Sequence, residues 1–336
     1  MATIKEVADL AGVSITTVSH VINSTRFVKQ ETRQRVIEAM QRLNYRPNNT
    51  ARSLRMGISK MLGLMVPDNS NPFFAEMARK IENLCYENGY NVILCNSDNN
   101  QEREASYIEL LIGKMVDGVI FIASGNQPDH LTKLVEAEIP IVIVDREVNQ
   151  QVADVILVDN CRGGYLATEY LIQLGHRNLA CISGSSKVTP SADRVQGYLQ
   201  ALHDYGLQPD HEKIVSGDLS YEGGMKAMNT LLSLSQPPTG VFCCNDLMAI
   251  GAMRAIRSAS LRVPEDVSLV GFDDIFIASA VTPALTTIAQ PISDIAGKAA
   301  ELLLERARNP ERERSATRII FQPQLIIRDS CHPVER

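Results

Sequence analysis

The feature that most constrains the fold is an alternation of short apolar runs with amphipathic segments, from about residue 60 almost to the end of the chain. Runs such as MLGLMV, IPIVIVD and VSLVGF are apolar at nearly every position. The segments that follow them carry apolar residues at helical spacing. Strands that are apolar throughout are typical of parallel sheets covered by helices on both faces. The number of these units predicts two open α/β sheets, and hence two lobes with a cleft between them.

Length and composition are those of a globular protein with a large core. The chain has 336 residues, of which 45% are hydrophobic and 21% charged. No apolar run is long enough to cross a bilayer, and the first residues, MATIKEVADLAG, lack the apolar core of a secretion signal. The seven cysteines have no C-x-x-C spacing and mostly fall in apolar runs, so we expect buried free thiols in a reducing cytoplasm.

Charge is distributed unevenly along the chain. Residues 1–60 hold ten Lys and Arg and four Asp and Glu, a net charge of +6. The whole chain has a net charge of −6, so residues 61–336 carry −12. A basic head on an acidic body suggests that the head meets a polyanion. A basic face that is merely solvated is the alternative, and charge alone does not exclude it.

The head, residues 1–46, reads as a helix-turn-helix module. Thr3 and Glu6 form a T-x-x-E capping box, Gly12 permits a tight turn, and Ser14 can cap the next helix, ITTVSHVIN. A third helix, QETRQRVIEAMQRLNY, braces the first two. Its expected core stripe is Val36, Ile37, Met40 and Leu43.

The second helix is the candidate DNA reader, because in this geometry its start enters the major groove. Threonine hydroxyls bond base edges, Ile15 suits a thymine methyl, and flanking polar residues suit phosphates. The predicted contacts in the head are Thr3, Ser14, Ile15, Thr16, Thr17, His20, Asn23 and Arg26. The alternatives are a small helical bundle with no DNA role and, for His20, an ordinary surface histidine.

The stretch PNNTARSLRMG, residues 47–57, predicts a short hinge helix between Pro47 and Gly57. Barely two turns long, it should fold only when DNA and a twin segment provide partners. Leu54 is then an apolar wedge for a minor-groove base step, with Arg52 and Arg55 contacting phosphate or groove. A leucine that packs on the body is the alternative.

The body has its own candidate site, because ligands of open α/β sheets bind beyond the carboxyl ends of the strands. Two aromatic rings, two arginines, amides and carboxylates stand at those ends. Aromatic faces can stack on a sugar ring, while carboxylates and amides accept its hydroxyl protons. The candidate effector-binding residues are Asn71, Phe73, Phe74, Asp145, Arg146, Arg194, Asn245, Asp273 and Gln290.

Each of these residues also has a simpler interpretation. Phe73 or its neighbour could be plain core, and Asp145 with Arg146 could be a surface ion pair worth under about 1 kcal/mol. Asn245 and Asp246 could cap the helix that follows them, and for Asp246 we expect only that role. These interpretations weaken because all the residues fall at strand ends.

Catalysis has little support. No P-loop, Rossmann G-x-G-x-x-G, H-E-x-x-H or G-x-S-x-G motif is present, and the six histidines are scattered. Asp145 and Asp273 could be a glycosidase pair, but carboxylates that only bind hydroxyls explain them equally well. We therefore expect no catalytic residues, no metal and no cofactor. A secreted transport receptor would share the body but would carry a signal peptide and no DNA-binding head.

The motifs resemble one known family. ATIKEVADLAGVSITTVSHVIN, followed by RPNNTARSLR, is similar to the lactose/galactose-repressor (LacI/GalR) family of bacterial transcription regulators. The resemblance implies a headpiece, a hinge helix and two Rossmann-like lobes of the periplasmic-binding-protein type. The implied boundaries are 1–46 for the headpiece, 47–57 for the hinge and 58–336 for the effector-binding and dimerisation domain, with an N-lobe of about 58–159 and 291–320 and a C-lobe of about 160–290 and 321–331.

Within the family the body is most similar to ribose operon repressors. The NPFF loop, the Asp-Arg pair, the arginine turn, Asn-Asp, Gly-Phe-Asp and Gln-Pro are all present. The purine-repressor branch is the next most similar, although a purine calls for a flat aromatic partner where this chain has Arg146. The resemblance implies a homodimeric, cytoplasmic, nucleoid-associated repressor on a palindromic operator, with D-ribose as inducer. Corepression, as in the purine branch, has the opposite sign, and the sequence does not decide between them.

Overall fold

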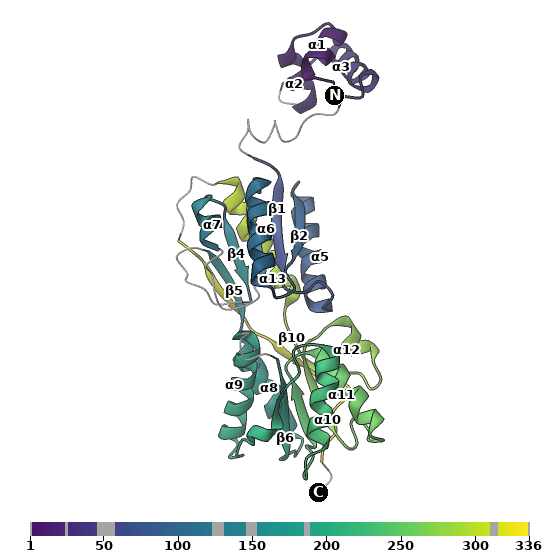
Figure 1. Ribbon diagram of the computed structural model, residues 1–336, viewed down its shortest axis with the longest axis vertical. Helices are drawn as coiled ribbons and strands as arrows, with labels where there is room; N and C mark the ends of the chain where they lie inside the picture. The colour runs from purple at the N-terminus through teal and green to yellow at the C-terminus, as the bar shows by residue number, and fades with distance from the viewer. Residues whose placement is uncertain are drawn as a thin grey trace. The chain divides into compact units, whose positions relative to one another are not determined.

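The computed structural model describes residues 2–23, 26–45, 58–122, 131–145, 153–184, 189–309 and 315–334. The chain divides into two compact units, Met1–Ser59 and Lys60–Arg336. Figure 1 shows helices α1, α2 and α3 of the first unit and the two sheets of the second.

The first unit has the predicted helix-turn-helix order: α1 (Ile4–Ala11), α2 (Ile15–Asn23) and α3 (Gln30–Arg42). The capping box of Thr3 and Glu6 is present, and Gly12 ends α1 in the left-handed conformation at φ 65°. The core stripe of α3 differs from the prediction. Val36 is buried with Ala39, whereas Ile37 is 37% exposed. The small core is complete with alanine on that face, so Ile37 turns outward.

The N-lobe of the second unit is a six-stranded sheet in the order β11-β5-β4-β3-β1-β2. Its strands are β1 (Met61–Val66), β2 (Asn91–Asn96), β3 (Val119–Ile122), β4 (Ile141–Val144), β5 (Asp154–Val158) and β11 (Arg318–Phe321). Its helices are α5 (Pro72–Glu87), α6 (Gln101–Gly113), α7 (Leu131–Glu136) and α13 (Ile292–Arg308).

The apolar runs of this sheet are buried on both faces, as predicted. Leu64 packs in the same cluster as Met77 of α5 and Leu303 of α13. Its neighbour Met65 packs in a separate cluster with Ile108 of α6. Successive side chains of a strand point to opposite faces, so this division places helices on each side of the sheet.

Strand β2 departs from the prediction of a fully buried strand. It lies at the edge of the sheet, paired only with β1 among the described strands. Leu94 in its middle is 47% exposed. An apolar run therefore did not identify an edge position.

The C-lobe repeats the architecture in the order β12-β10-β9-β8-β6-β7. Its strands are β6 (Leu179–Ser183), β7 (Ile214–Ser216), β8 (Gly240–Cys243), β9 (Ser268–Asp273), β10 (Thr286–Ala289) and β12 (Gln324–Ile326). Its helices are α8 (Asn160–Gln173), α9 (Thr189–Asp204), the short 3-10 turn η1 (His211–Lys213), α10 (Tyr221–Leu232), α11 (Asp246–Ser258) and α12 (Phe276–Ala280).

The last two strands show how the lobes face each other. β11 pairs parallel with β5 in the N-lobe, and β12, two residues further on, pairs antiparallel with β10 in the C-lobe. A chain that continues in one direction and is parallel to one sheet but antiparallel to the other implies that the two sheets point in opposite directions. The carboxyl ends of both sets of strands therefore meet between the lobes, where ligands of such sheets bind.

Two further expectations concern the whole chain. All seven cysteines are free, and five of them are buried. Among the described residues, no helix combines the length and the apolar character needed to cross a membrane.

Candidate functional site

The candidate DNA-reading helix presents polar and apolar side chains to solvent. Ile15 is 47% exposed and Thr16 is exposed, while Thr17 is half-buried. The Ser14 hydroxyl accepts the Thr17 N–H at 3.1 Å and lies 2.9 Å from its hydroxyl. Ser14 therefore caps α2, as predicted.

The remaining predicted DNA contacts are in mixed environments. Thr3 is exposed but engaged in the capping box, and His20 is half-buried. The Asn23 amide donates to the carbonyl of Ser19 at 2.9 Å, and Arg26 is exposed. The hinge segment 47–57, with Arg52, Leu54 and Arg55, lies outside the described residues.

In the second unit, strand ends from both lobes line one narrow pocket. Four of its residues come from the N-lobe and six from the C-lobe. They are Asn71, Phe73, Phe74, Asp145, Pro190, Ser191, Arg194, Leu219, Asn245 and Asp273. The list includes seven of the nine predicted effector contacts.

Arg194, near the middle of α9, is the hub of the C-lobe half. Only 5% exposed, it donates from Nε to Asn160 Oδ1 at 2.8 Å and from Nη1 to the Cys244 carbonyl at 2.5 Å. Nη1 also lies 3.4 Å from Asp273 Oδ1. The guanidinium sits 3.7 Å from the ring centroid of Phe272, a cation–π contact. The side chain is thus fixed on several sides by the protein itself.

Asp273, at the end of β9, is the buried carboxylate of the pocket. It accepts the Gln290 amide N–H at 2.7 Å. Burial raises the pKa of the Asp273 carboxyl to about 6, while the Arg194 guanidinium and the Gln290 bond act to lower it and Asp145 acts to raise it. Gln290 is absent from the pocket lining but takes part through this bond.

The N-lobe half is mostly aromatic. Phe73 and Phe74 meet edge to face, with ring centroids 5.1 Å apart. Asn71 caps α5 by accepting the Phe73 N–H at 3.0 Å. Phe73 is also a core residue, at 3% exposure. It therefore both packs in the core and lines the pocket, as its two interpretations suggested. Arg146 lies outside the described residues.

Asn245 and Asp246 differ from each other in role. Asn245 lines the pocket and also caps α11 by accepting the Met248 N–H at 2.9 Å. The prediction that Asp246 only caps this helix is wrong. Its carboxylate instead accepts the Thr287 hydroxyl at 2.5 Å and the Ile275 N–H at 2.9 Å.

Backbone strain gathers at the pocket. Asp145, Leu219 and Asp273 all line it and all have left-handed φ angles, of 64°, 68° and 109°. Such conformations are costly for residues with a side chain and collect at ligand sites. Leu219, with Pro190 and Ser191, was missed by the sequence interpretation, because these residues come from loops and a helix start with no strand end to mark them.

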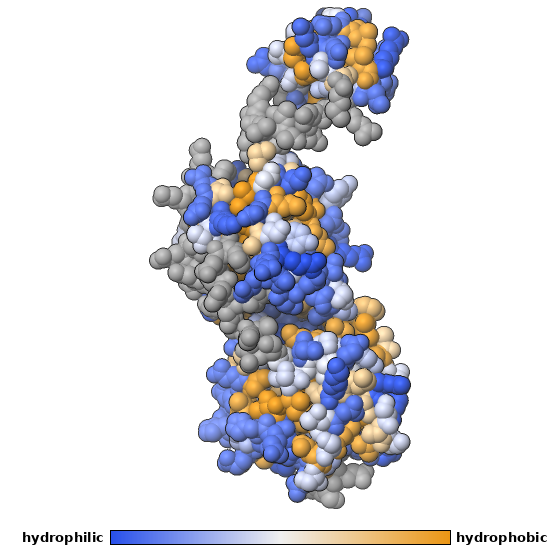
Figure 2. Space-filling model, viewed as in Figure 1, coloured by the Kyte–Doolittle hydropathy of each residue, from blue (hydrophilic) through white to orange (hydrophobic). Residues whose placement is uncertain are grey.

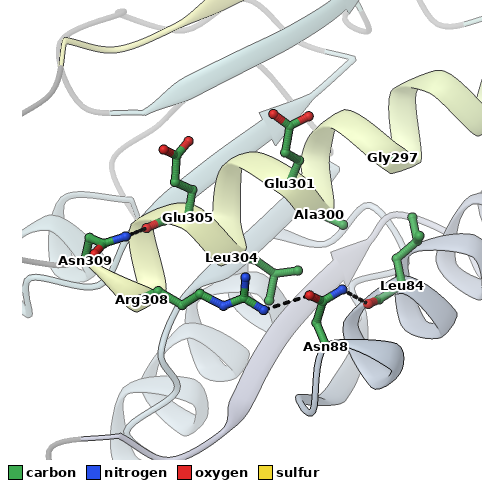
Figure 3. A pocket seen from close by; sticks show the side chains of 9 residues that line it. All are labelled: Leu84, Asn88, Gly297, Ala300, Glu301, Leu304, Glu305, Arg308 and Asn309. Atoms are coloured by element: carbon green, nitrogen blue, oxygen red, sulfur yellow. Dashed lines mark hydrogen bonds between the residues drawn. The ribbon is translucent and has the colours of Figure 1, made fainter.

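A second pocket, between α5 and α13, is larger, but among the described residues it is not lined by buried charged side chains (Figure 3). Its volume is about 470 Å³, against about 50 Å³ for the pocket between the lobes. Some of its polar groups bond to one another: Arg308 donates to Asn88 at 2.7 Å, and Asn88 donates to the Leu84 carbonyl at 2.8 Å. The smaller pocket, with its buried charges, is therefore the better functional candidate.

Comparison with known families decides the identity of both units. Residues 59–328 match the model of periplasmic binding proteins and the sugar-binding domain of the LacI family. Residues 3–48 match the model of bacterial regulatory proteins of the lacI family. The chain belongs to the LacI family.

Individual relatives agree with this assignment. The transcriptional repressor PurR of Pasteurella multocida is 42% identical over 331 residues, 98% of each chain. The lac repressor dimer bound to operator and the anti-inducer ONPF is 27% identical, covers 98% of this chain and 99% of its own, and superposes with a TM-score of 0.85. A LacI-family regulator from Enterococcus faecium with bound ribose is 32% identical over 82% of this chain and 100% of its own, with a TM-score of 0.74.

These findings confirm the predicted LacI-family architecture, with a helix-turn-helix region followed by two lobes of parallel strands. The chain is a DNA-binding repressor of this family with a sugar-binding type of domain. It is a regulator and not an enzyme, since its relatives are named as transcriptional repressors. D-ribose as the effector is not confirmed.

Proposed function

We propose that this LacI-family repressor changes its affinity for a palindromic operator when a small polar molecule binds in the pocket between its lobes. The observation that carries the proposal is a buried set of three residues: Arg194 on α9 and Asp273 at the end of β9, which line the pocket, and Gln290 after β10, which bonds to Asp273. Charges and amides are rarely buried this deeply unless they are paired and used.

One atom of this set supports a ligand directly. Gln290 is 6% exposed, and among the described residues its Oε1 has no hydrogen-bond partner. Buried polar atoms in folded proteins almost always have a partner. A hydroxyl or N–H of the effector would provide one.

A purine base or nucleoside is the first candidate effector. Several full-length relatives of this chain are named PurR, one of them with 42% identity over 98% of both chains. They back this candidate better than they back D-ribose. In the pocket, a base would lie against the rings of Phe73 and Phe74, with its N–H groups toward Asp273.

D-ribose is the second candidate, and the side chains favour it. Two carboxylates, an arginine and amides converge on the pocket, which suits a ligand with several hydroxyls. The E. faecium relative, 32% identical over the lobes, holds ribose. The direction of the change in operator affinity depends on the effector. Ribose is expected to weaken operator binding as an inducer, and a purine to strengthen it as a corepressor.

The switch itself would connect the lobes to the headpieces. Binding would change how the lobes close and so shift the hinge segments of two protomers. A coupling of about 1–3 kcal/mol changes operator affinity roughly 5–150-fold. The residues proposed to contact DNA are those predicted from the sequence in the headpiece and the hinge, with Leu54 of the hinge as the wedge.

A homodimer is part of the proposal, because a palindrome needs two heads related by symmetry. The lac repressor dimer on its operator is a relative of matching fold. Figure 2 shows hydrophobic residues at the surface of both lobes. Leu94 and Phe276 are 47% and 70% exposed. A contiguous patch of such residues would suit an interface between protomers. A place beside the nucleoid remains a prediction.

Isothermal titration of the purified protein with hypoxanthine, guanine, nucleosides, D-ribose and other pentoses tests the effector. Binding of hypoxanthine or guanine but not ribose supports the first candidate, and the converse supports the second. If no member of the panel binds, the proposed effector class is wrong.

The DNA side needs a separate experiment. Selection of duplexes from a random pool should recover a palindrome, and a shift assay at fixed salt should show its affinity changing with effector. Recovery of no palindromic sequence would contradict the operator proposal. Arg26→Ala and Thr16→Ala should weaken binding without changing the titration of effector.

A further inference from the structure

Asp246 is a buried carboxylate that the proposed effector does not touch. It is 0% exposed and is absent from the residues that line the pocket. Burial raises the pKa of its carboxyl well above the usual range, and the charge of Asp273 raises it further. Burying a carboxyl group costs desolvation free energy, and such groups are often found where they serve a structural or functional role.

The bonds of Asp246 lead to the backbone that carries Asp273. One oxygen accepts the Ile275 N–H at 2.9 Å, and the other accepts the Thr287 hydroxyl at 2.5 Å. The Asp246 carboxylate therefore ties the residue just after the Asp273–Asp274 turn to β10, which runs beside β9.

The turn between these anchors is strained. Asp273 and Asp274 have successive left-handed φ angles of 109° and 57°. Such angles are unfavourable for residues with a side chain, so the conformation persists only where its surroundings impose it. The turn brings the Asp273 carboxylate into the pocket beside Arg194.

Arg328 holds the same turn from a second direction. Its Nη2 donates to Asp274 Oδ1 at 2.6 Å, and its Nη1 donates to the Leu285 carbonyl at 2.8 Å. Arg328 follows β12, so the returning end of the chain fastens the turn to the start of β10.

Gly271 leaves room for this arrangement. A Cβ built at Gly271 would lie 2.2 Å from Asp246 Oδ1, far inside contact distance. The carboxylate is thus packed directly against the backbone of β9, two residues before Asp273. Any side chain at Gly271 would displace it.

We propose that Asp246 and Arg328 are positioning residues that hold the strained Asp273–Asp274 turn, and so set the affinity for effector without contacting it. This inference rests on the proposed function of the pocket. If the turn relaxes, the carboxylate leaves the guanidinium of Arg194 and the amide of Gln290, and the pocket loses its preorganised centre.

The test measures effector affinity by titration, using whichever panel molecule binds the wild type, in three variants of the full chain. Asp246→Asn replaces one acceptor oxygen by an NH₂ group and should weaken binding about tenfold or more, as expected when a buried donor loses its acceptor. Arg328→Met should weaken it by a similar factor. Asp266→Asn, which removes an exposed partner of Arg262 in the same lobe, is the matched control and should bind within about twofold of wild type.

A second pair isolates one bond and guards against unfolding. Thr287→Val keeps the shape but removes the hydroxyl that Asp246 accepts, and should weaken binding several-fold. Thr287→Ser restores the hydroxyl and should restore affinity. For both, operator affinity without effector should stay within about twofold of wild type, because a general loss of structure would lower it as well.

The outcomes separate the two proposals. A wild-type protein that binds no panel molecule defeats the proposed function. If wild type binds and folded Asp246→Asn, Arg328→Met and Thr287→Val all bind within about twofold of it, the positioning role is overturned. If the first two variants do not fold, the Thr287 pair decides.

Discussion

The two lobes of the second unit have the same strand order but contribute unlike chemistry to the pocket between them. Each has six strands, with the first β-α-β crossover at one edge and the returning chain at the other. The N-lobe provides two aromatic rings and Asp145, whereas the C-lobe provides Arg194, Asn245 and Asp273. Repetition of a fold therefore does not repeat a site. In the C-lobe half, the polar side chains Arg194 and Asp273 already have hydrogen-bond partners within the lobe. The N-lobe half is largely an apolar surface formed by Phe73 and Phe74.

The lobes also fasten the returning end of the chain in different ways. In the N-lobe, Arg306 makes a two-pronged ion pair with Asp154, both bonds at 2.7 Å, and Asp154 also accepts the Thr317 N–H. In the C-lobe, the neutral hydroxyl of Ser330 accepts the Thr286 N–H and donates to the Leu269 carbonyl. Ion pairs and hydroxyls respond differently to substitution and to pH, which makes the comparison testable.

The largest expected effect is on the N-lobe fastening. Arg306→Leu leaves the Asp154 carboxylate, whose side chain is 0% exposed, without its cation. An unpaired buried charge of this kind costs about 3–5 kcal/mol. Denaturant unfolding should show that loss in the free energy of unfolding, provided that the second unit unfolds as one cooperative transition.

Three controls belong with this measurement. The double variant Asp154→Leu/Arg306→Leu should recover much of the loss, since no charge stays buried. Lys298→Ala, which breaks an exposed pair with Glu301 on the same helix, should cost under about 1 kcal/mol. Ser330→Ala, the C-lobe counterpart, should cost about 1–3 kcal/mol. A loss for Ser330→Ala equal to that for Arg306→Leu would erase the distinction between the lobes.

The second prediction compares the two halves of the pocket. Arg194→Met removes the cation beside buried Asp273 and should weaken effector binding about 100-fold, or roughly 3 kcal/mol. Phe74→Ala in the N-lobe removes a ring face and should cost about 0.5–1.5 kcal/mol. Titration of both variants with the same effector measures the ratio. If Phe74→Ala proves as damaging as Arg194→Met, recognition is centred on the N-lobe instead.

Much of this pocket could be predicted from the sequence because its residues follow recognisable strands. Asp145 and Asp273 stand where an apolar run stops, Asn71 lies in the loop after another run, and the carboxyl ends of strands in such sheets converge on one cleft. The fold class follows from the same runs. Leu219 carries no such mark, because its place depends on a strained loop that only tertiary packing determines.

Roles that depend on partners far along the chain were harder to predict. Asp246 begins a helix, which suggests a cap, yet its partner Thr287 is 41 residues away. Ile37 has the spacing of a core residue, but the residues that α3 buries in the small headpiece core are Val36 and Ala39. Burial is a property of the packed unit, and a local pattern can only suggest it.

The third prediction uses pH to mark the C-lobe half. Burial raises the pKa of Asp273 to about 6. To accept hydrogen bonds from the effector with both oxygens, the Asp273 carboxyl must be ionised. The affinity for effector should therefore be highest above that pKa and fall about tenfold between pH 7 and pH 5. The groups that face it are Arg194, Asp145 and Asp246. Phe74→Ala should give a parallel curve, lowered by one factor at every pH, whereas an effector curve that stays flat in the wild type would show that Asp273 does not accept from the ligand.

The smallest expected effect concerns the last residues of the chain in the C-lobe. His176 is 4% exposed, with Nδ1 3.0 Å from the Thr239 hydroxyl and Nε2 3.1 Å from the His332 carbonyl. Burial lowers the pKa of His176, so below the unfolded value of about 6.5 the unfolded chain takes up a proton more readily, and the free energy of unfolding falls as pH falls.

His176→Gln should lower the free energy of unfolding by about 1 kcal/mol at pH 7.5, because its hydrogen bonds are weaker. It should also remove part of the decline in unfolding free energy between pH 7 and pH 5, measured by denaturant titration at each pH. The bond to Asp154 raises the pKa of Arg306, so this guanidinium stays charged over this range, and Arg306→Leu should leave the histidine-dependent part of the decline in place. An unchanged slope in His176→Gln would mean that the C-lobe end of the chain is not held by a neutral imidazole, and the contrast between a charged and a neutral fastening would then rest on Ser330 alone.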